Sequence, residues 1–189
     1  MAKYMKVRLV INKMYILSQV LVVISDILCI ISMLTKNKKS VVFYLIFSTI
    51  LFGSHFLCLA EYTGAVLALV ELIFLILMYI LEIKDKLQYT TILSLVTIVV
   101  SIILSILTWD TWVSVLSMMA MIIYLVTMMF KNLVVVKSGV FVRITLNAIY
   151  MFLIRSYLGA GLSIVILIFT ILGVVQDIKA NRSEEKNNV

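Results

Sequence analysis

Two acidic residues and the only histidine of this chain lie within long apolar stretches, where they could do chemistry. Asp26 and Glu71 are well inside such stretches, and His55 is close to the end of another. Charged side chains are costly in hydrocarbon and commonly mark binding or proton-transfer sites there. Gln19 is two helical turns, about 10 Å, from Asp26 on the same face of a helix. We therefore expect a site for a small solute or a coupling proton formed by Gln19, Asp26, His55, Glu71 and Asn147.

Each of these polar residues also has a structural explanation. His55 can snorkel toward the membrane interface or bond to a backbone carbonyl. Asp26 and Glu71 can be neutral and hydrogen-bonded to a neighbouring helix, and Asn147 can join two helices through its amide. Arg143 is expected to be an anchor at the membrane interface. The sequence leaves both interpretations open for the acidic residues.

The chain lacks the residue patterns of common catalytic and metal sites. It has no H-E-x-x-H motif and no Gly-rich phosphate loop. A serine or cysteine nucleophile would have only His55 as a conventional base. Cys29 and Cys58 lie in apolar runs, which is typical of small buried residues. We therefore expect a protein that is not an enzyme and that binds no metal and no cofactor.

The composition predicts a lipid environment. Of 189 residues, 64% are hydrophobic and 13% are charged, with a mean hydropathy of +1.21. A soluble domain is about 45–50% apolar and could not hide this excess in its core. Long apolar runs without alternation predict helices rather than a barrel. The net charge of +7 comes from basic residues in connectors, so no nucleic-acid partner is expected.

Seven apolar stretches are long enough for transmembrane helices, which need about 20 residues. The prediction is an all-α membrane protein with a basic segment at 1–12, a seven-helix transmembrane domain at 13–177 and a polar tail at 180–189. The tail is expected to be disordered because its composition is polar and charged. The seven stretches are Lys13–Leu34, Ser40–Leu59, Gly64–Leu81, Thr90–Thr108, Trp112–Phe130, Gly139–Ile154 and Gly159–Gln176.

An internal repeat relates the two halves of the chain at an offset of 95 residues. YTGAVLALVELIFLILMYILEIK (Tyr62–Lys84) overlies YLGAGLSIVILIFTILGVVQDIK (Tyr157–Lys179), and ISMLTKN (Ile31–Asn37) overlies VTMMFKN (Val126–Asn132). Between these blocks the alignment shifts by three positions, which pairs Lys39-Ser40 with Lys137-Ser138. The repeat predicts a parallel 3+1+3 arrangement, with repeat one at 13–84, a linker helix at 90–108 and repeat two at 112–179. Parallel repeats are a known plan of transporters.

Small residues recur at matching places in the two repeats. Gly64 and Ala68 are four residues apart, as are Gly159 and Ser163. Small residues at this spacing let membrane helices approach closely. We expect all four to serve helix packing.

The basic residues predict an orientation in the membrane. Eleven of them lie on the side of the odd connectors and the C-terminus, and five lie on the other side. The positive-inside rule then favours an outer N-terminus and a cytoplasmic C-terminus. The eleven are Lys36, Lys38, Lys39, Lys84, Lys86, Lys131, Lys137, Arg143, Lys179, Arg182 and Lys186, and the five are Lys3, Lys6, Arg8, Lys13 and Arg155.

Three short motifs make the chain similar to the YgjV-type family of bacterial inner-membrane proteins. They are Tyr15-Ile-Leu-Ser-Gln19, His55-Phe56 and Tyr62-Thr-Gly64-Ala65. The resemblance covers most of the chain, more loosely in its second half. It implies a bacterial plasma membrane and a distant relationship to SWEET-like and PnuC-like transporters. The chain has no proline, so the proline hinges characteristic of SWEET-type transporters are missing.

Together these features predict an integral membrane protein that carries a small solute through a polar site between the two repeats. The alternative is a non-transporting membrane component that binds a partner protein. A water-accessible cavity near Asp26 distinguishes the carrier from the alternative. The sequence names no solute and leaves open whether the chain forms a homo-oligomer.

Overall fold

The computed structural model describes residues 2–84, 86–109, 111–130 and 132–187, with side chains described from residue 14 to residue 179 within these ranges, except at residue 87. The described residues form seven α-helices and one short 3-10 helix, with no strand among them. The prediction of an all-helical protein is confirmed. The elements are α1 (Ala2–Leu34), α2 (Lys38–Cys58), α3 (Tyr62–Ile83), η1 (Leu87–Tyr89), α4 (Thr90–Leu107), α5 (Ser114–Met128), α6 (Leu133–Leu153) and α7 (Tyr157–Asn187).

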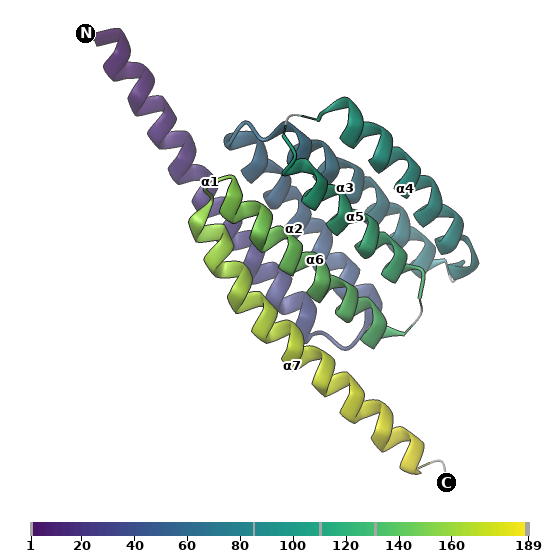
Figure 1. Ribbon diagram of the computed structural model, residues 1–189. Helices are drawn as coiled ribbons and strands as arrows, with labels where there is room; N and C mark the ends of the chain where they lie inside the picture. Colours follow the sequence, from purple (N-terminus) through teal and green to yellow (C-terminus); the bar gives the residue numbers. More distant parts are fainter. Residues whose placement is uncertain (1, 85, 110, 131, 188–189) are drawn as a thin grey trace.

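The helices form one bundle in which successive helices run in alternate directions (Figure 1). Neighbours in sequence pack against each other, and contacts of α1 with α7 and of α3 with α5 close a ring of six helices. Helix α4 lies outside this ring against α3 and α5. Helix α1 begins and helix α7 ends at opposite ends of the bundle (Figure 1). The connectors are short, and a few residues can do no more than reverse the direction of the chain, which explains why the helices alternate.

Within the described residues, six helices are long and apolar enough to cross a membrane. The predicted stretch Trp112–Phe130 contains only the 15-residue helix α5, because residues 111–113 form turns and bends and the helix ends at Met128. At 1.5 Å per residue α5 is about 22 Å long, shorter than the roughly 30 Å hydrocarbon core. The structure thus supports a multi-pass membrane protein with six full-length spans and a shorter seventh helix.

Helix α4 shows that apolar side chains face outward. Leu95, Val99 and Ile106 are 53%, 56% and 62% exposed, which is favourable only against lipid. The opposite face of α4 carries small hydroxyl residues, including Ser94 and Ser101, that are fully buried against neighbouring helices. Small side chains allow close approach of membrane helices. Lipid exposure therefore explains the apolar face of α4, and close packing explains the small side chains of its buried face.

Both ends of α2 and α6, and the starts of α3 and α7, match at a constant offset of 95 residues. The side chains of Asn37 and Asn132 accept hydrogen bonds from backbone N–H groups of α2 and α6, and both helices have 21 residues. Both helices are followed by a residue with positive φ, Ala60 and Arg155, and by a backbone bond characteristic of a Schellman motif. The predicted shift of three residues is wrong, because it matched two Lys-Ser pairs that lie at different depths in α2 and α6.

Helices α1 and α7 extend well past the bundle in opposite directions (Figure 1). The segment 1–12 is helical from Ala2 and continuous with the first span. The prediction of a disordered tail is wrong, since α7 continues to Asn187. Lys, Ala, Arg and Glu in this segment are good helix formers, and extending an existing helix requires no new nucleus.

Gly173 allows the contact between α7 and α1 that closes the ring. A Cβ atom at this position would overlap the backbone carbonyl oxygen of Met33. Gly173→Ala should therefore lower the free energy of unfolding by about 1–3 kcal/mol, the usual cost of overpacking, measured by thermal or detergent-induced unfolding. Gly161→Ala on the same helix is the control, because a Cβ atom there meets nothing within 4 Å. Equal stability of the two variants would contradict this account of the junction.

Candidate functional site

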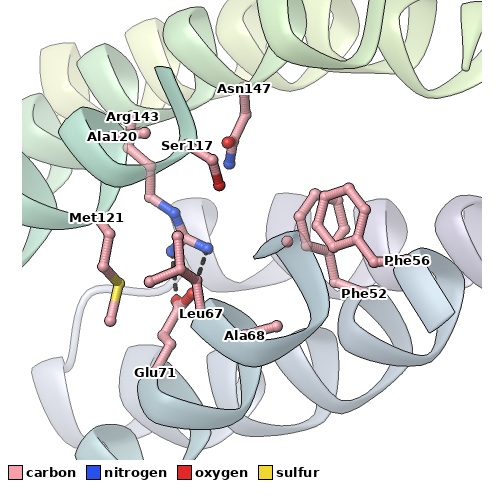
Figure 2. Close-up of a pocket in the computed structure, with 11 residues that line it drawn as sticks. Phe52, Phe56, Leu67, Ala68, Glu71, Ser117, Ala120, Met121, Arg143 and Asn147 are labelled. Atoms are coloured by element: carbon pink, nitrogen blue, oxygen red, sulfur yellow. Dashed lines mark hydrogen bonds and ion pairs between the residues drawn. The ribbon is translucent and has the colours of Figure 1, made fainter. Parts of the chain in front are cut away.

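A bidentate ion pair between Glu71 of α3 and Arg143 of α6 lies inside the bundle (Figure 2). The guanidinium Nη1 atom is 2.5 Å from Glu71 Oε1, and Nη2 donates to Oε2 at 2.7 Å. The guanidinium carbon lies 4.5 Å from the centre of the Tyr124 ring, a cation–π contact from α5. Thr49 of α2 donates a hydrogen bond to Glu71 Oε1 at 3.4 Å. Four helices therefore meet at this pair.

The expectation that Arg143 is an interfacial anchor is wrong. The residue is in the middle of α6, because this helix begins at Leu133, six residues before the predicted start. Its side chain is only 13% exposed, and that of Glu71 is 5% exposed. A guanidinium matches a carboxylate in geometry, which makes Arg suitable for a buried pair. The pair neutralises two charges that neither helix could place in the membrane interior alone.

Asp26 of α1 is buried without a partner for one of its oxygens. The residue is 7% exposed, and its Oδ2 atom has no hydrogen bond within the described part of the chain. It lines a cavity of about 40 Å³, which is room for two or three water molecules at roughly 10–15 Å³ each. We call this space the Asp26 cavity. Its other polar lining residues are Ser25, Cys29, Ser48, Thr49, Arg143, Asn147 and Ser163.

A second, smaller cavity lies on the Glu71 side of Arg143. This Glu71 cavity has a volume of about 20 Å³ and is lined by Glu71, Ser117, Arg143 and Asn147 together with apolar side chains. Figure 2 shows the amide of Asn147 and the hydroxyl of Ser117 pointing into the space between the helices, with two phenylalanine rings beside it. Arg143, Asn147 and Phe52 line both cavities. These three side chains therefore separate the two spaces.

Three of the five predicted site residues meet at these cavities, namely Asp26, Glu71 and Asn147. Gln19 and His55 line neither. Gln19 lies beside Ser18, to whose hydroxyl its amide donates a hydrogen bond. Gln19 and His55 therefore belong to a group of polar residues separate from the one around Arg143 and its two cavities.

His55 joins three segments of the chain. Its side chain is fully buried, with Nδ1 2.9 Å from the carbonyl oxygen of Ser18 and Nε2 3.4 Å from Ser156 Oγ. A carbonyl oxygen only accepts hydrogen bonds, so Nδ1 carries the proton and donates it, and Nε2 accepts from the hydroxyl. These bonds connect α1, α2 and the start of α7. Such an arrangement positions helices and leaves the imidazole without access to either cavity.

The four small residues predicted for packing lie at close helix contacts or beside the site. A Cβ atom on Gly64 would lie 3.0 Å from the Phe56 ring, and one on Gly159 would lie 2.6 Å from Met151 Sδ. Ala68 faces Gly53 across the contact of α2 with α3. Ser163 lines the Asp26 cavity and donates its hydroxyl to the carbonyl of Gly159.

A second buried ion pair lies outside the cavities. Lys137 Nζ of α6 is 2.8 Å from Asp177 Oδ2 of α7, and the side chains are 1% and 8% exposed. In the first half Lys38 pairs with Glu82, the residue 95 positions before Asp177. Lys137 corresponds to a position one helical turn deeper than Lys38, which explains its greater burial. Sequence reasoning missed this pair because it placed Lys137 in a connector.

Charge and ligand types limit what this site can hold. Two carboxylates and one guanidinium give a net charge of −1 when Asp26, Glu71 and Arg143 are ionised. Within the described residues no three His, Cys, Asp or Glu side chains come together as a metal site would require. The arrangement offers a small ligand the oxygen atoms of neutral hydroxyl and amide side chains, together with the unpaired carboxylate oxygen of Asp26.

A comparison with models of known protein families matches most of the chain. A family model for Imp-YgjV, described as a bacterial inner membrane protein, matches residues 16–181. Neither a curated protein nor a solved structure matches the chain. The matched range includes every residue that lines the two cavities. It also agrees with the six apolar helices long enough to cross a membrane. The chain therefore belongs to the Imp-YgjV family and is an integral, multi-pass protein of the bacterial inner membrane.

Proposed function

We propose that this protein is a carrier that moves a small solute across the membrane through the Asp26 cavity. The observation that carries the proposal is the unpartnered Oδ2 atom of Asp26, which is buried and lines a cavity between the halves of the chain. A buried carboxylate without a partner is strongly unfavourable, so it persists where it binds something. The role is one of binding and release, and no catalytic step is required.

The carrier is proposed to consist of two parallel three-helix repeats joined by α4. Both ends of α2 and α6 and the starts of α3 and α7 match at an offset of 95 residues, and repeat-related helices such as α1 and α5 run in the same direction (Figure 1). The Asp26 cavity itself supports the pairing, because α2 and α6 contribute four residues each at this offset. The four pairs are Leu45 with Val140, Ser48 with Arg143, Thr49 with Ile144 and Phe52 with Asn147.

In this proposal the two repeats open the site alternately to the two sides of the membrane. The Asp26 cavity of about 40 Å³ then represents a closed state. The junctions that move are the contacts of α1 with α7 and of α3 with α5, because these connect the repeats directly. Helix α5 belongs to the second repeat as a seventh crossing, despite its 15 residues. Gating of this kind requires two packings of the same helices.

We also propose that the N-terminus is outside and the C-terminus is cytoplasmic. Lys137 and Arg143 lie inside α6 and are ion-paired, so they no longer count as connector charges. Nine basic residues then remain on the side of the C-terminus against five on the other. The rule that cytoplasmic connectors are rich in Lys and Arg supports this orientation.

The native residue Cys29 provides the test, because it lines the Asp26 cavity. In a Cys58→Ser variant, Cys29 should react with a charged, membrane-impermeant methanethiosulfonate reagent from at least one side of the membrane. The reaction is measured by mass spectrometry after treatment of intact cells and of inverted vesicles. A carrier exposes its site to water during its cycle, so the thiol becomes accessible.

The control is Val99→Cys in a chain without the two native cysteines. Val99 is 56% exposed on the outer face of α4, so lipid should protect a thiol there from the charged reagent. If Cys29 is as inert as the control from both sides, the protein has no water path to the site. That result favours the alternative, a membrane component that binds a partner protein.

A further inference from the structure

The charges around the two cavities do not balance. Glu71 and Arg143 neutralise each other through two short contacts, at 2.5 Å and 2.7 Å. Asp26 is left without a cationic partner among the described residues, although it is only 7% exposed. A bare charge at such a position is unfavourable. A counter-charge must therefore accompany Asp26 whenever the cavity is closed.

The lining of the Asp26 cavity supplies oxygen atoms suited to a small cation. The hydroxyls of Ser25 and Ser48 each donate to the backbone carbonyl of the other, at 2.9 Å and 3.0 Å. Their hydrogens are thus engaged, and their oxygen lone pairs remain available to accept. Thr49, Asn147 and Ser163 add side-chain oxygens. Hard cations prefer such oxygen ligands.

The size and composition of the cavity restrict the ligand further. About 40 Å³ holds an ion with one or two waters, and no metabolite of ordinary size. The charged and titratable groups facing the cavity are Cys29 on the same helix as Asp26 and Arg143 on α6, with Glu71 of α3 behind the guanidinium. The lining residues of α2 and α7 are uncharged.

We propose that the Asp26 cavity binds one monovalent cation, Na⁺ or a proton, as the exchangeable counter-charge of Asp26. The inference rests on the proposed function, from which it takes the location of the binding site. It extends that function by naming the class of ligand. The expected stoichiometry is one cation per chain, because the second repeat has no acidic residues at the positions that correspond to Asp26 and Glu71. The residues 95 positions after Asp26 and Glu71 are Met121 and Ile166, both apolar.

Thermal unfolding of the purified full-length protein tests the proposal. Melting curves are recorded at pH 5.5 and 8.5 in NaCl or in choline chloride of equal ionic strength. Bound Na⁺ should raise the apparent Tm at pH 8.5 by about 3–6 °C at ten times its Kd. A bound proton should instead give a Tm that falls by a similar amount between pH 5.5 and 8.5, whatever the salt. Either response should disappear in Asp26→Asn.

Asp177→Asn is the matched control, since it also converts a buried carboxylate to an amide but lies outside the cavity. It should lower the Tm and keep the response to Na⁺ or pH. Equal responses of the wild type and Asp26→Asn to both variables would overturn the proposal. Cation binding without solute movement would keep the inference and remove the carrier function.

A second measurement needs no variant and covers the case in which Asp26→Asn does not fold. Dicyclohexylcarbodiimide reacts with protonated carboxyl groups in apolar surroundings, and mass spectrometry locates the product. The wild-type chain should be modified at Asp26, with slower reaction at pH 8.5 or in Na⁺. The carboxylate of Asp177, paired with Lys137, should remain unmodified. A rate at Asp26 that is independent of pH and of Na⁺ would contradict the proposal.

Discussion

Arg143→Gln is expected to lower the free energy of unfolding by about 3–5 kcal/mol, the cost of removing one partner from a buried ion pair. The glutamine cannot reproduce the two contacts that Arg143 makes with Glu71, and it also loses the contact with Tyr124. The carboxylate is then left in the bundle without its counter-charge. Unfolding of the purified protein by heat or by sodium dodecyl sulfate measures the loss.

The double variant separates the ion pair from the packing of its side chains. Glu71→Gln alone should destabilise the protein by a similar amount, because it leaves the guanidinium unpaired. Combining it with Arg143→Gln should recover a large part of the loss, since two neutral amides can bond to each other. Additive losses in the double variant would show that the two charges act independently, contrary to the geometry.

Lys137→Gln is the second substitution with a large expected effect, again about 3–5 kcal/mol. Lys137 is 1% exposed and 2.8 Å from Asp177, so its removal leaves a buried carboxylate. The related pair of Lys38 and Glu82 is longer, at 3.2 Å, and its side chains are 13% and 12% exposed. Lys38 is the first residue of α2, near the end of the bundle.

Lys38→Gln is therefore the matched control and should cost less than Lys137→Gln, because the side chains of Lys38 and Glu82 are both more exposed than those of Lys137 and Asp177. Both variants can be compared in the same unfolding experiment. The ratio of the two losses in unfolding free energy tests whether an ion pair stabilises the protein more when it lies one helical turn deeper in the bundle. Similar losses in the two variants would refute that interpretation.

Most of the fold could be predicted from the sequence, because the length of each apolar stretch determines whether it forms a membrane-spanning helix. Each predicted stretch overlaps one helix, and the errors lie at the helix ends. The sequence placed the start of α6 at Gly139, whereas Asn132 caps it and the helix begins at Leu133. The reason is that Lys137 was read as a connector residue, although an acidic partner on α7 allows it to lie inside a helix. At Lys137 the ion pair with another helix therefore outweighs the low hydropathy of the local sequence.

The site could be predicted only in part, because the pairing of polar side chains between helices cannot be seen in the sequence. Asp26, Glu71 and Asn147 stand out as polar residues in apolar stretches, and the structure places all three at the cavities. His55 stands out equally, yet its ring is used by backbone and hydroxyl groups of other segments. Arg143 was missed although Glu71 requires a counter-charge in the membrane. A search for one basic residue per buried acid would have found it.

The ring of helices constrains how the chain could be rearranged. Helices α1 and α7 touch, but they run in the same direction, so the C-terminus emerges on the face opposite to the N-terminus (Figure 1). A circular permutant of this chain needs more than a short peptide, because the peptide would have to connect opposite ends of the bundle. The new link would have to run along the bundle, as α4 does between α3 and α5. An added apolar helix of about 20 residues would have the length for such a link.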